Sequence, residues 1–290
     1  MQATRRLFPV EAPRLLRAAR VIHPFPVALN VIATAGLAAI ANEGLPEPAV
    51  LTRLCAAMFC VQAAIGALND YCDRELDALT KPWKPIVAGA IEPRSALVVA
   101  ACSALVAGAL TATFGPLSFV VGAAGLAAGV AYDVRLKRSV LSALPFMVAL
   151  AALPFWVWVS LDRFVDQLWW LLAFAPLVGL SVHLANTAPD LESDRVAGVR
   201  GLAHVIGLQA TVIVCWTSFA LVLVGATALG LHLRYDWAQF LVGALPAAGL
   251  LSLAIAAYYI RPGQAALQLG FGAIGVATAS LAVGWLAAVG

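Results

Sequence analysis

The sequence predicts an all-α integral membrane protein, a single domain over residues 1–290 in which nine transmembrane helices surround a central cavity. Three observations predict this fold. Of the 290 residues, 62% are hydrophobic and only 11% are charged, a balance typical of membrane proteins rather than soluble ones. The apolar residues gather in runs long enough to cross a bilayer. If each run crosses it once, most of the basic residues fall on the same side of the membrane.

Nine apolar runs fill the chain after its first 23 residues. Each approaches the roughly 17–25 residues that a transmembrane helix needs, and the fourth is short and rich in glycine. We expect membrane lipid among the partners of this chain and no nucleic acid. The expected spans are 24–42, 50–69, 95–113, 117–133, 140–160, 167–188, 205–231, 238–260 and 265–288.

The distribution of basic residues tests this topology through the positive-inside rule. With a cytoplasmic N-terminus, fifteen of the eighteen lysines and arginines fall on the cytoplasmic side. The three exceptions are Arg53, Arg163 and Arg234. We therefore expect the N-terminus and the polar loops after the second, fourth and sixth spans to be cytoplasmic.

Residues 1–23 form a basic segment ahead of the first span. They carry five arginines, and Arg20 and His23 lie nearest to the span. We interpret the segment as cytoplasmic and interfacial, an amphipathic stretch that also sets the topology. A cleaved signal peptide is not expected, because eight further spans follow the first.

A stripe of oxygen-bearing side chains ends the second span. Asn69, Asp73 and Asp77 follow the apolar run 54–68 at intervals of four residues. If the helix continues through them they lie on one face, because each step of four residues drifts only about 40° around the axis. Asp70 and Glu75 lie off this stripe, where they are expected either to contact the metal ligands from behind or to act as extra ligands.

The same pattern returns at Asn186, Asp190 and Asp194, at the end of the sixth span. A lone stripe of this kind is often only a solvated helix end. Two matched stripes, both at the ends of apolar helices, instead indicate a metal site. Carboxylate and amide oxygens suit Mg²⁺, which usually binds one or two carboxylates together with substrate phosphates.

Basic side chains follow the second and fourth spans. Lys81 and Lys84 come soon after the first stripe, and Lys137 and Arg138 come soon after Tyr132. Positive-inside bias explains some of this charge. Beside a carboxylate-lined cavity the same cations would also bind the oxygens of a diphosphate.

These motifs resemble the UbiA superfamily of intramembrane prenyltransferases. That family carries NxxxDxxxD after its second helix and a similar acidic motif after its sixth, and both are matched here. The segment Lys81–Ile86 resembles its basic, proline-containing segment, with Lys84 where arginine is common. The segment Tyr132–Arg138 resembles its Tyr…Lys-Arg loop. The motif Asn-Asp-Tyr-x-Asp-Arg-Glu-x-Asp resembles that of the family branch containing chlorophyll synthases and archaeal-type glycerolipid prenyltransferases.

The resemblance implies Mg²⁺-dependent transfer of a prenyl group from an allylic prenyl diphosphate to an electron-rich, lipophilic acceptor inside the membrane. It implies that the four stripe aspartates are catalytic and that Lys84, Tyr132, Lys137 and Arg138 bind the diphosphate. The metal ligands would be Asn69, Asp73, Asp77, Asn186, Asp190 and Asp194.

Several alternatives stay open at this point. A membrane terpene cyclase on the same scaffold and a cation transporter with an acidic vestibule are the competing functions. The acceptor is a phenol, a quinone precursor, a chlorin or a glycerophosphate. His183 is expected to be a hydrogen-bonded packing residue rather than a base. Phe155 and Trp156 are expected either to line an apolar tunnel or to face lipid.

Overall fold

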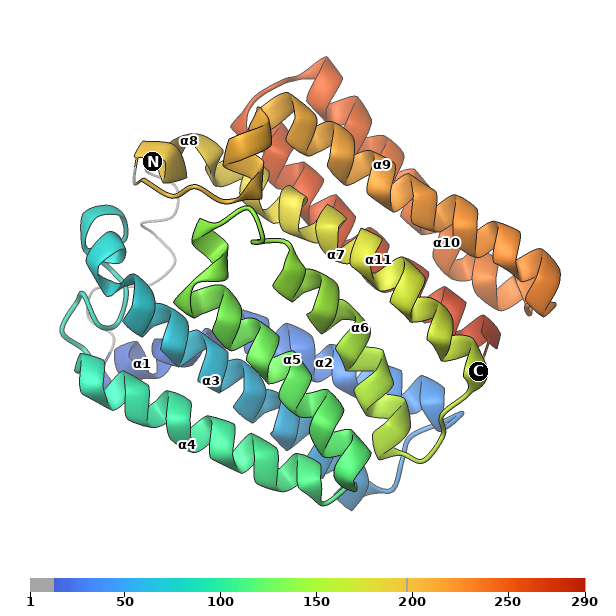
Figure 1. Ribbon diagram of the computed structural model, residues 1–290, viewed down its shortest axis with the longest axis horizontal. Coiled ribbons are helices and arrows are strands. Elements are labelled where there is room, and N and C mark those ends of the chain that lie inside the picture. The colour runs from blue at the N-terminus through green and yellow to red at the C-terminus, as the bar shows by residue number, and fades with distance from the viewer. Residues whose placement is uncertain (1–12, 197, 290) are drawn as a thin grey trace.

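The computed structural model describes residues 13–196 and 198–289, and these residues form helices joined by short loops, without a β-strand in the described part (Figure 1). Arg5 and Arg6 of the predicted basic segment lie outside the described residues. The helices are α1 (Arg14–Ala19), η2 (Arg20–Ile22), α2 (Pro24–Ala41), α3 (Pro48–Thr80), α4 (Pro93–Ala112), α5 (Pro116–Val134), η3 (Leu136–Arg138), α6 (Leu144–Ser160), η4 (Asp166–Trp170), α7 (Leu171–Thr187), η5 (Ala188–Asp190), α8 (Leu191–Val196), α9 (Leu202–Leu233), α10 (Trp237–Ile260) and α11 (Gln264–Val289).

Eight helical stretches among the described residues are long and apolar enough to cross a membrane. They are α2, α3, α4, α5, the stretch from η4 to η5, α9, α10 and α11. The chain is thus an integral multi-pass membrane protein. The remaining apolar helix, α6, has 17 residues, or about 26 Å at the usual helical rise. It begins at Leu144 because residues 140–143 form turns, so the expected count of nine spans stays a prediction.

The helix α3 carries the first acidic stripe and is helical along all of it. Its start is fixed by Pro48 in the first turn and by Glu47, whose side chain accepts a hydrogen bond from the Ala49 backbone at 3.3 Å. It ends at Thr80, just before Pro82, which has no backbone N–H to continue a helix. The stripe is therefore presented on one rigid element, as the sequence predicted.

The second stripe is presented differently. Asn186 lies in the last turn of α7, Asp190 ends the 3₁₀ turn η5 and Asp194 lies on the short helix α8. Pro189 stands inside this stretch, and its missing N–H interrupts the α-helical hydrogen-bond ladder there. The stripe is consequently divided among three helical segments, α7, η5 and α8.

Close helix contacts at glycine hold the bundle together. A Cβ atom on Gly129 of α5 would stand 2.4 Å from the Cδ1 atom of Ile65 on α3, so these helices approach closely. A Cβ atom on Gly243 of α10 would stand 2.3 Å from the Ser280 carbonyl oxygen of α11. Small residues at such crossings are a common way of packing helices inside membranes.

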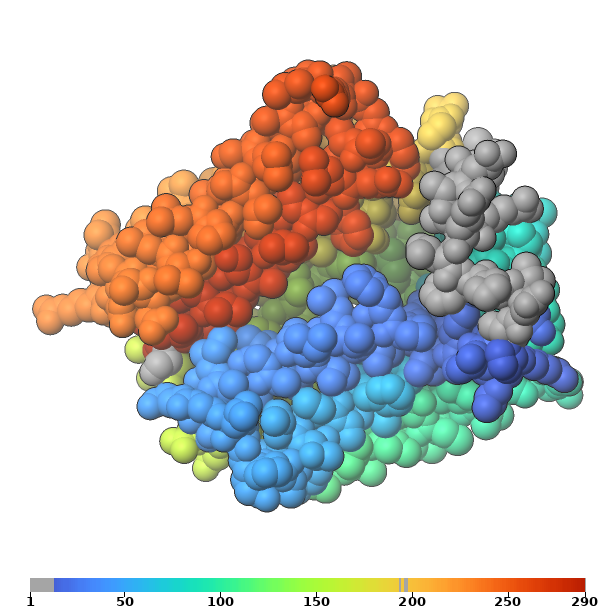
Figure 2. Space-filling view, turned by 180° about the vertical axis from the view of Figure 1, so that it is seen from behind, coloured from blue at the N-terminus to red at the C-terminus, as the bar shows by residue number. Residues whose placement is uncertain are grey.

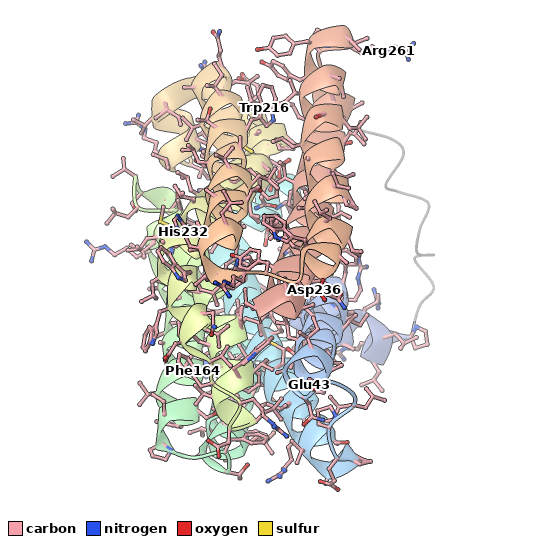
Figure 3. All side chains as sticks on the ribbon, turned by 90° about the vertical axis from the view of Figure 1, so that its right-hand side faces the viewer. Glu43, Phe164, Trp216, His232, Asp236 and Arg261 are labelled. Carbon is pink, nitrogen blue, oxygen red and sulfur yellow. The ribbon has the colours of Figure 1, made fainter. Side chains whose placement is uncertain are left out.

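The helices form two blocks. Figure 2 shows the orange and red C-terminal helices above the blue N-terminal ones, with a furrow between them. In Figure 3 the turn at Arg261 and the turn marked by His232 and Asp236 lie at opposite ends of the C-terminal helices. Phe155 and Trp156 of α6 are buried in the main hydrophobic core, so neither faces lipid, and neither lines the polar pocket described below.

Candidate active site

A polar pocket lies where α3, α5 and α7 end and α9 begins. Its cavity has a volume of about 190 Å³. Eight of the predicted site residues line it together, although they come from three separate parts of the chain. They are Asn69, Asp73, Tyr132, Lys137, Arg138, Asn186, Asp190 and Asp194.

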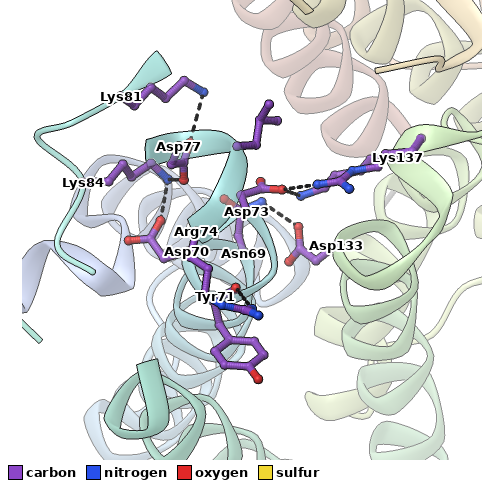
Figure 4. Close-up of polar contacts among 12 residues, drawn as sticks. Asn69, Asp70, Tyr71, Asp73, Arg74, Asp77, Lys81, Lys84, Asp133 and Lys137 are labelled. Atoms are coloured by element: carbon purple, nitrogen blue, oxygen red, sulfur yellow. Dashed lines mark hydrogen bonds and ion pairs between the residues drawn. The ribbon is translucent and has the colours of Figure 1, made fainter. Parts of the chain in front are cut away.

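Asp73 occupies the centre of the first stripe and meets the basic turn η3. Its Oδ1 atom lies 2.5 Å from the Lys137 Nζ atom and 3.4 Å from an Arg138 guanidinium nitrogen. Asp73 and Lys137 are both largely buried, with side chains 14% and 12% exposed, so little water screens this ion pair. The pair joins α3 to the connection between α5 and α6, two segments more than 60 residues apart in sequence (Figure 4).

Asp77 lies one turn further along α3 but does not line the pocket. Its side chain is buried and pairs with two lysines, the Oδ1 atom at 4.0 Å from Lys81 Nζ and the Oδ2 atom at 3.6 Å from Lys84 Nζ. Lys84 also contacts Asp70, on the side of the stripe away from the pocket. Lys81, which is not among the predicted diphosphate ligands, does line the pocket, whereas Lys84 does not.

Asp70 anchors two neighbouring segments to α3. It is only 1% exposed, and its Oδ1 atom accepts from Lys84 and lies 2.7 Å from His23 Nε2. Gly66, one turn earlier, allows the backbone at Ile22 to pack against α3, because a Cβ atom there would stand 2.9 Å from Ile22. Glu75, the other residue off the stripe, is 88% exposed and pairs with Arg74 at 3.2 Å, away from the pocket.

The second stripe forms the opposite wall of the pocket. Burial raises the pKa of the Asp194 carboxyl above its usual range, and the negative charge of Asp190 raises it further. A carboxylate whose pKa is raised by a neighbouring negative charge is stabilised in its ionised form by a nearby cation. The wall thus has the electrostatic character of a cation site, with Asn186 adding a neutral amide oxygen.

Tyr132 and His183 lie together at the inner end of the pocket. The Tyr132 ring packs edge-on against Phe146 and His183, with ring centroids 5.4 and 6.3 Å apart. His183 is 1% exposed, and its Nε2 atom is 2.9 Å from Ser142 Oγ. His183 is therefore a buried, hydrogen-bonded residue, in line with the packing role expected from the sequence.

Sequence reasoning missed two contributors. Asp133 is buried behind the first stripe, where its Oδ1 atom accepts a hydrogen bond from Asn69 Nδ2 at 2.8 Å. Ser142 lines the pocket and accepts from the Leu202 backbone N–H at 3.0 Å. Asp133 follows Tyr132 directly in the basic motif, but only the packing of α5 on α3 reveals its partner.

The donor set fits a hard divalent cation that is shared with a substrate. Both walls present carboxylate and amide oxygens, the ligands that Mg²⁺ prefers. Among the described residues, however, no group of three or more His, Cys, Asp or Glu side chains is close enough to hold a metal alone. Such a site matches Mg²⁺ chemistry, in which waters and substrate phosphates complete the coordination.

Comparison with known proteins agrees with this chemistry. The family model described as UbiA prenyltransferase family matches residues 29–273. Digeranylgeranylglyceryl phosphate synthase of Halobacterium salinarum is 30% identical over 83% of this chain and 90% of its own length. The bacteriochlorophyll synthase 33 kDa chain of Cereibacter sphaeroides is 31% identical over 53% of this chain and 54% of its own length.

Solved structures share the fold. One, from work on digeranylgeranylglyceryl phosphate synthase in membranes, superposes with a TM-score of 0.76 at 14% identity, covering 95% of this chain and 98% of the other. A UbiA homologue from Archaeoglobus fulgidus bound to GPP and Mg²⁺ superposes with a TM-score of 0.68 at 16% identity, covering 92% of this chain and all of the other.

The contacts of Asp70 lead to a prediction about stability. Asp70→Ala removes the carboxylate that pairs with both Lys84 and His23. Breaking a buried pair typically costs about 3–5 kcal/mol, and because Asp77 remains 3.6 Å from Lys84 we expect a loss at the lower end of that range. Chemical unfolding of the purified protein in detergent measures this loss. Glu75→Ala on the same helix is the matched control, since its side chain is exposed. Equal stability of the two variants would contradict a buried anchor at Asp70.

Proposed function

The chain belongs to the UbiA prenyltransferase family, and from this premise we propose that it uses Mg²⁺ to transfer a prenyl group from an allylic prenyl diphosphate to an electron-rich, lipophilic acceptor within the membrane. One observation carries the proposal: a single pocket gathers residues of both acidic stripes, the basic turn and Tyr132. Family membership does not favour the terpene cyclase or the cation transporter. The chain is thus a prenyltransferase of a membrane-embedded kind.

Six residues would hold the metal, namely Asn69, Asp73, Asp77, Asn186, Asp190 and Asp194. Bound Mg²⁺ would neutralise the diphosphate and stabilise the charge that develops as it leaves. The structure of the Archaeoglobus fulgidus homologue bound to GPP and Mg²⁺ supports this choice of metal and substrate. The four aspartates among these residues are the proposed catalytic groups, and Asp70 supports them from behind the stripe.

Lys137 and Arg138 are the proposed diphosphate ligands, together with Tyr132 and Lys84. Lys137 and Arg138 now pair with Asp73 at the pocket wall, so an arriving diphosphate offers these cations a second anionic partner. Apolar side chains around the pocket would exclude water, which would otherwise react with the cation-like allylic carbon. The acceptor would then attack that carbon and form the new bond.

The relatives support an order in which to test acceptor classes. The longest of the matches described above carries the name digeranylgeranylglyceryl phosphate synthase and covers 90% of that protein, so a lipid glycerophosphate comes first in a panel of acceptors. Chlorins come second, on the bacteriochlorophyll synthase match over 54% of that chain. Phenols and quinone precursors complete the panel.

An activity assay tests the proposal directly. Purified protein incubated with prenyl diphosphates of several chain lengths, the acceptor panel and Mg²⁺ should release diphosphate and yield a prenylated acceptor, identified by its mass. EDTA should abolish the reaction, because both stripes offer only oxygen ligands for a divalent metal, and excess Mg²⁺ or Mn²⁺ should restore it. A cyclised product formed without acceptor would refute the proposed transfer. Full turnover in metal-free protein would refute its dependence on Mg²⁺.

Substitutions separate the stripes from the basic turn. Asp73→Ala or Asp190→Ala should lower kcat by at least the roughly 10²–10³-fold seen when one preorganised stabilising group is lost. Lys137→Ala should mainly raise KM for the prenyl diphosphate, if its contact is equally strong in the ground and transition states. Steady-state kinetics measures both effects.

Asp166→Ala, an exposed change at the far end of the bundle, is the control for these substitutions. Normal kcat in folded Asp73→Ala and Asp190→Ala would rule out the two-stripe site. Loss of kcat without a change in KM in Lys137→Ala would instead indicate that Lys137 contacts the diphosphate mainly in the transition state.

The pocket is proposed to open to the cytoplasm, on the side of the N-terminus. The basis is the placement of fifteen of the eighteen basic residues on that side. In a variant without native cysteines, a cysteine at Arg200 should react with an impermeant maleimide only from the cytoplasmic side, and one at Asp162 only from the outside. Both positions are exposed. The reverse labelling pattern would show that the topology is the opposite of the one proposed.

A further inference from the structure

We propose that Asp133 is a positioning residue that orients Asn69, so that the Asn69 side chain presents its oxygen, and not its NH₂ group, to the metal. The inference rests on the proposed function, because it concerns how one of the predicted metal ligands is held. Asp133 belongs to neither acidic stripe, and it does not line the pocket. Its effect on the metal would be indirect, through the amide of Asn69.

The contact itself is short and buried. Asn69 Nδ2 donates to Asp133 Oδ1 at 2.8 Å, between side chains that are 64 residues apart in sequence. Asp133 is 3% exposed, whereas Asn69 is half-buried and lines the pocket. Asp133 therefore stands behind Asn69 as seen from the pocket, and Figure 4 shows the two side chains directed at one another.

The chemistry of the pair fixes which edge of the amide faces Asp133. An ionised carboxylate only accepts hydrogen bonds, and the NH₂ group is the only donor of an asparagine side chain. The NH₂ edge must accordingly point to Asp133, which holds the oxygen edge on the other side. A freely turning amide would present donor hydrogens to a cation in part of its conformations.

Helix packing sets the distance between the two side chains. Gly129 and Ile65 lie one turn before Asp133 and Asn69 on the same two helices, and the missing side chain of Gly129 lets them touch. Both members of the pair are thus carried by helices, and neither depends on a loop. Partners of this kind orient metal ligands in many proteins, and their loss typically weakens metal binding by about 10–100-fold.

Metal binding measured without catalysis tests the inference. Free Mn²⁺ in the presence of inorganic pyrophosphate is followed by EPR for the wild type, Asp133→Leu, Asp133→Asn and Asn69→Ala, and for Asn69→Ala combined with Asp133→Leu. Asp133→Leu has a similar volume but no acceptor, and it should weaken Mn²⁺ binding by about 10–100-fold. Asp133→Asn still accepts from Asn69 Nδ2 in one of its two orientations, and it should stay within about threefold of the wild type.

The double variant separates positioning from direct liganding. If Asp133 acts through Asn69, Asp133→Leu should cost almost nothing further once Asn69 is alanine. A full additional loss in the double variant, or an equal loss in Asp133→Asn and Asp133→Leu, would overturn the proposal, because a ligand or a proton acceptor would behave in that way. Should Asp133→Leu fail to fold, Asp133→Ala takes its place in the cycle.

Two controls complete the experiment. Asp162→Asn removes an exposed carboxylate at the other end of the bundle, and thermal melting in detergent reports any general loss of structure. Wild-type Mn²⁺ binding in Asp133→Leu would refute the positioning role and leave the proposed function standing. Absence of both Mn²⁺ binding and transferase activity in the wild-type protein would refute the proposed function, and the positioning role with it.

Discussion

The site depends on balancing the three aspartates that α3 carries to the end of the bundle. Each one meets basic side chains from other segments: Asp70 meets Lys84 and His23, Asp73 meets Lys137 and Arg138, and Asp77 meets Lys81 and Lys84. A buried carboxylate is costly unless it is paired. The same pairs that relieve this cost also tie the N-terminal segment, the loop after α3 and the basic turn η3 to one helix.

This balance gives the cations two uses. Asp70 and its partners His23 and Lys84 lie behind the stripe, where Asp70 holds the N-terminal segment and the loop after α3 to the helix. Asp73, Lys137 and Arg138 line the pocket, and a diphosphate with its metal would offer each of them a new partner of opposite charge. The helix α3 thus carries two ion clusters. The structural one surrounds Asp70, and the exchangeable one surrounds Asp73 at the pocket.

The sequence predicted features that repeat along one element and missed those that depend on how two elements meet. Spacing by four residues was enough to place Asn69 and Asp73 on one helical face, and the helix is continuous there. Spacing did not reveal the 3₁₀ turn that contains Pro189, because a proline is tolerated where one helix ends and another starts. The partner of Lys84 depends on the path of a loop, and the partner of Asp133 on the contact between Gly129 and Ile65, which no local pattern encodes.

The short helix α6 connects the fold to the chemistry. Because α6 starts only at Leu144, residues 139–143 remain as turns that fold beneath the second stripe. There Ser142 accepts from the Leu202 N–H and contacts His183, and Gly201 packs so closely that a Cβ atom would stand 3.0 Å from the Lys137 carbonyl oxygen. These contacts tie the turn that carries Lys137 to the start of α9, while Lys137 itself pairs with Asp73 on α3. The connection between α5 and α6 therefore links the two acidic stripes.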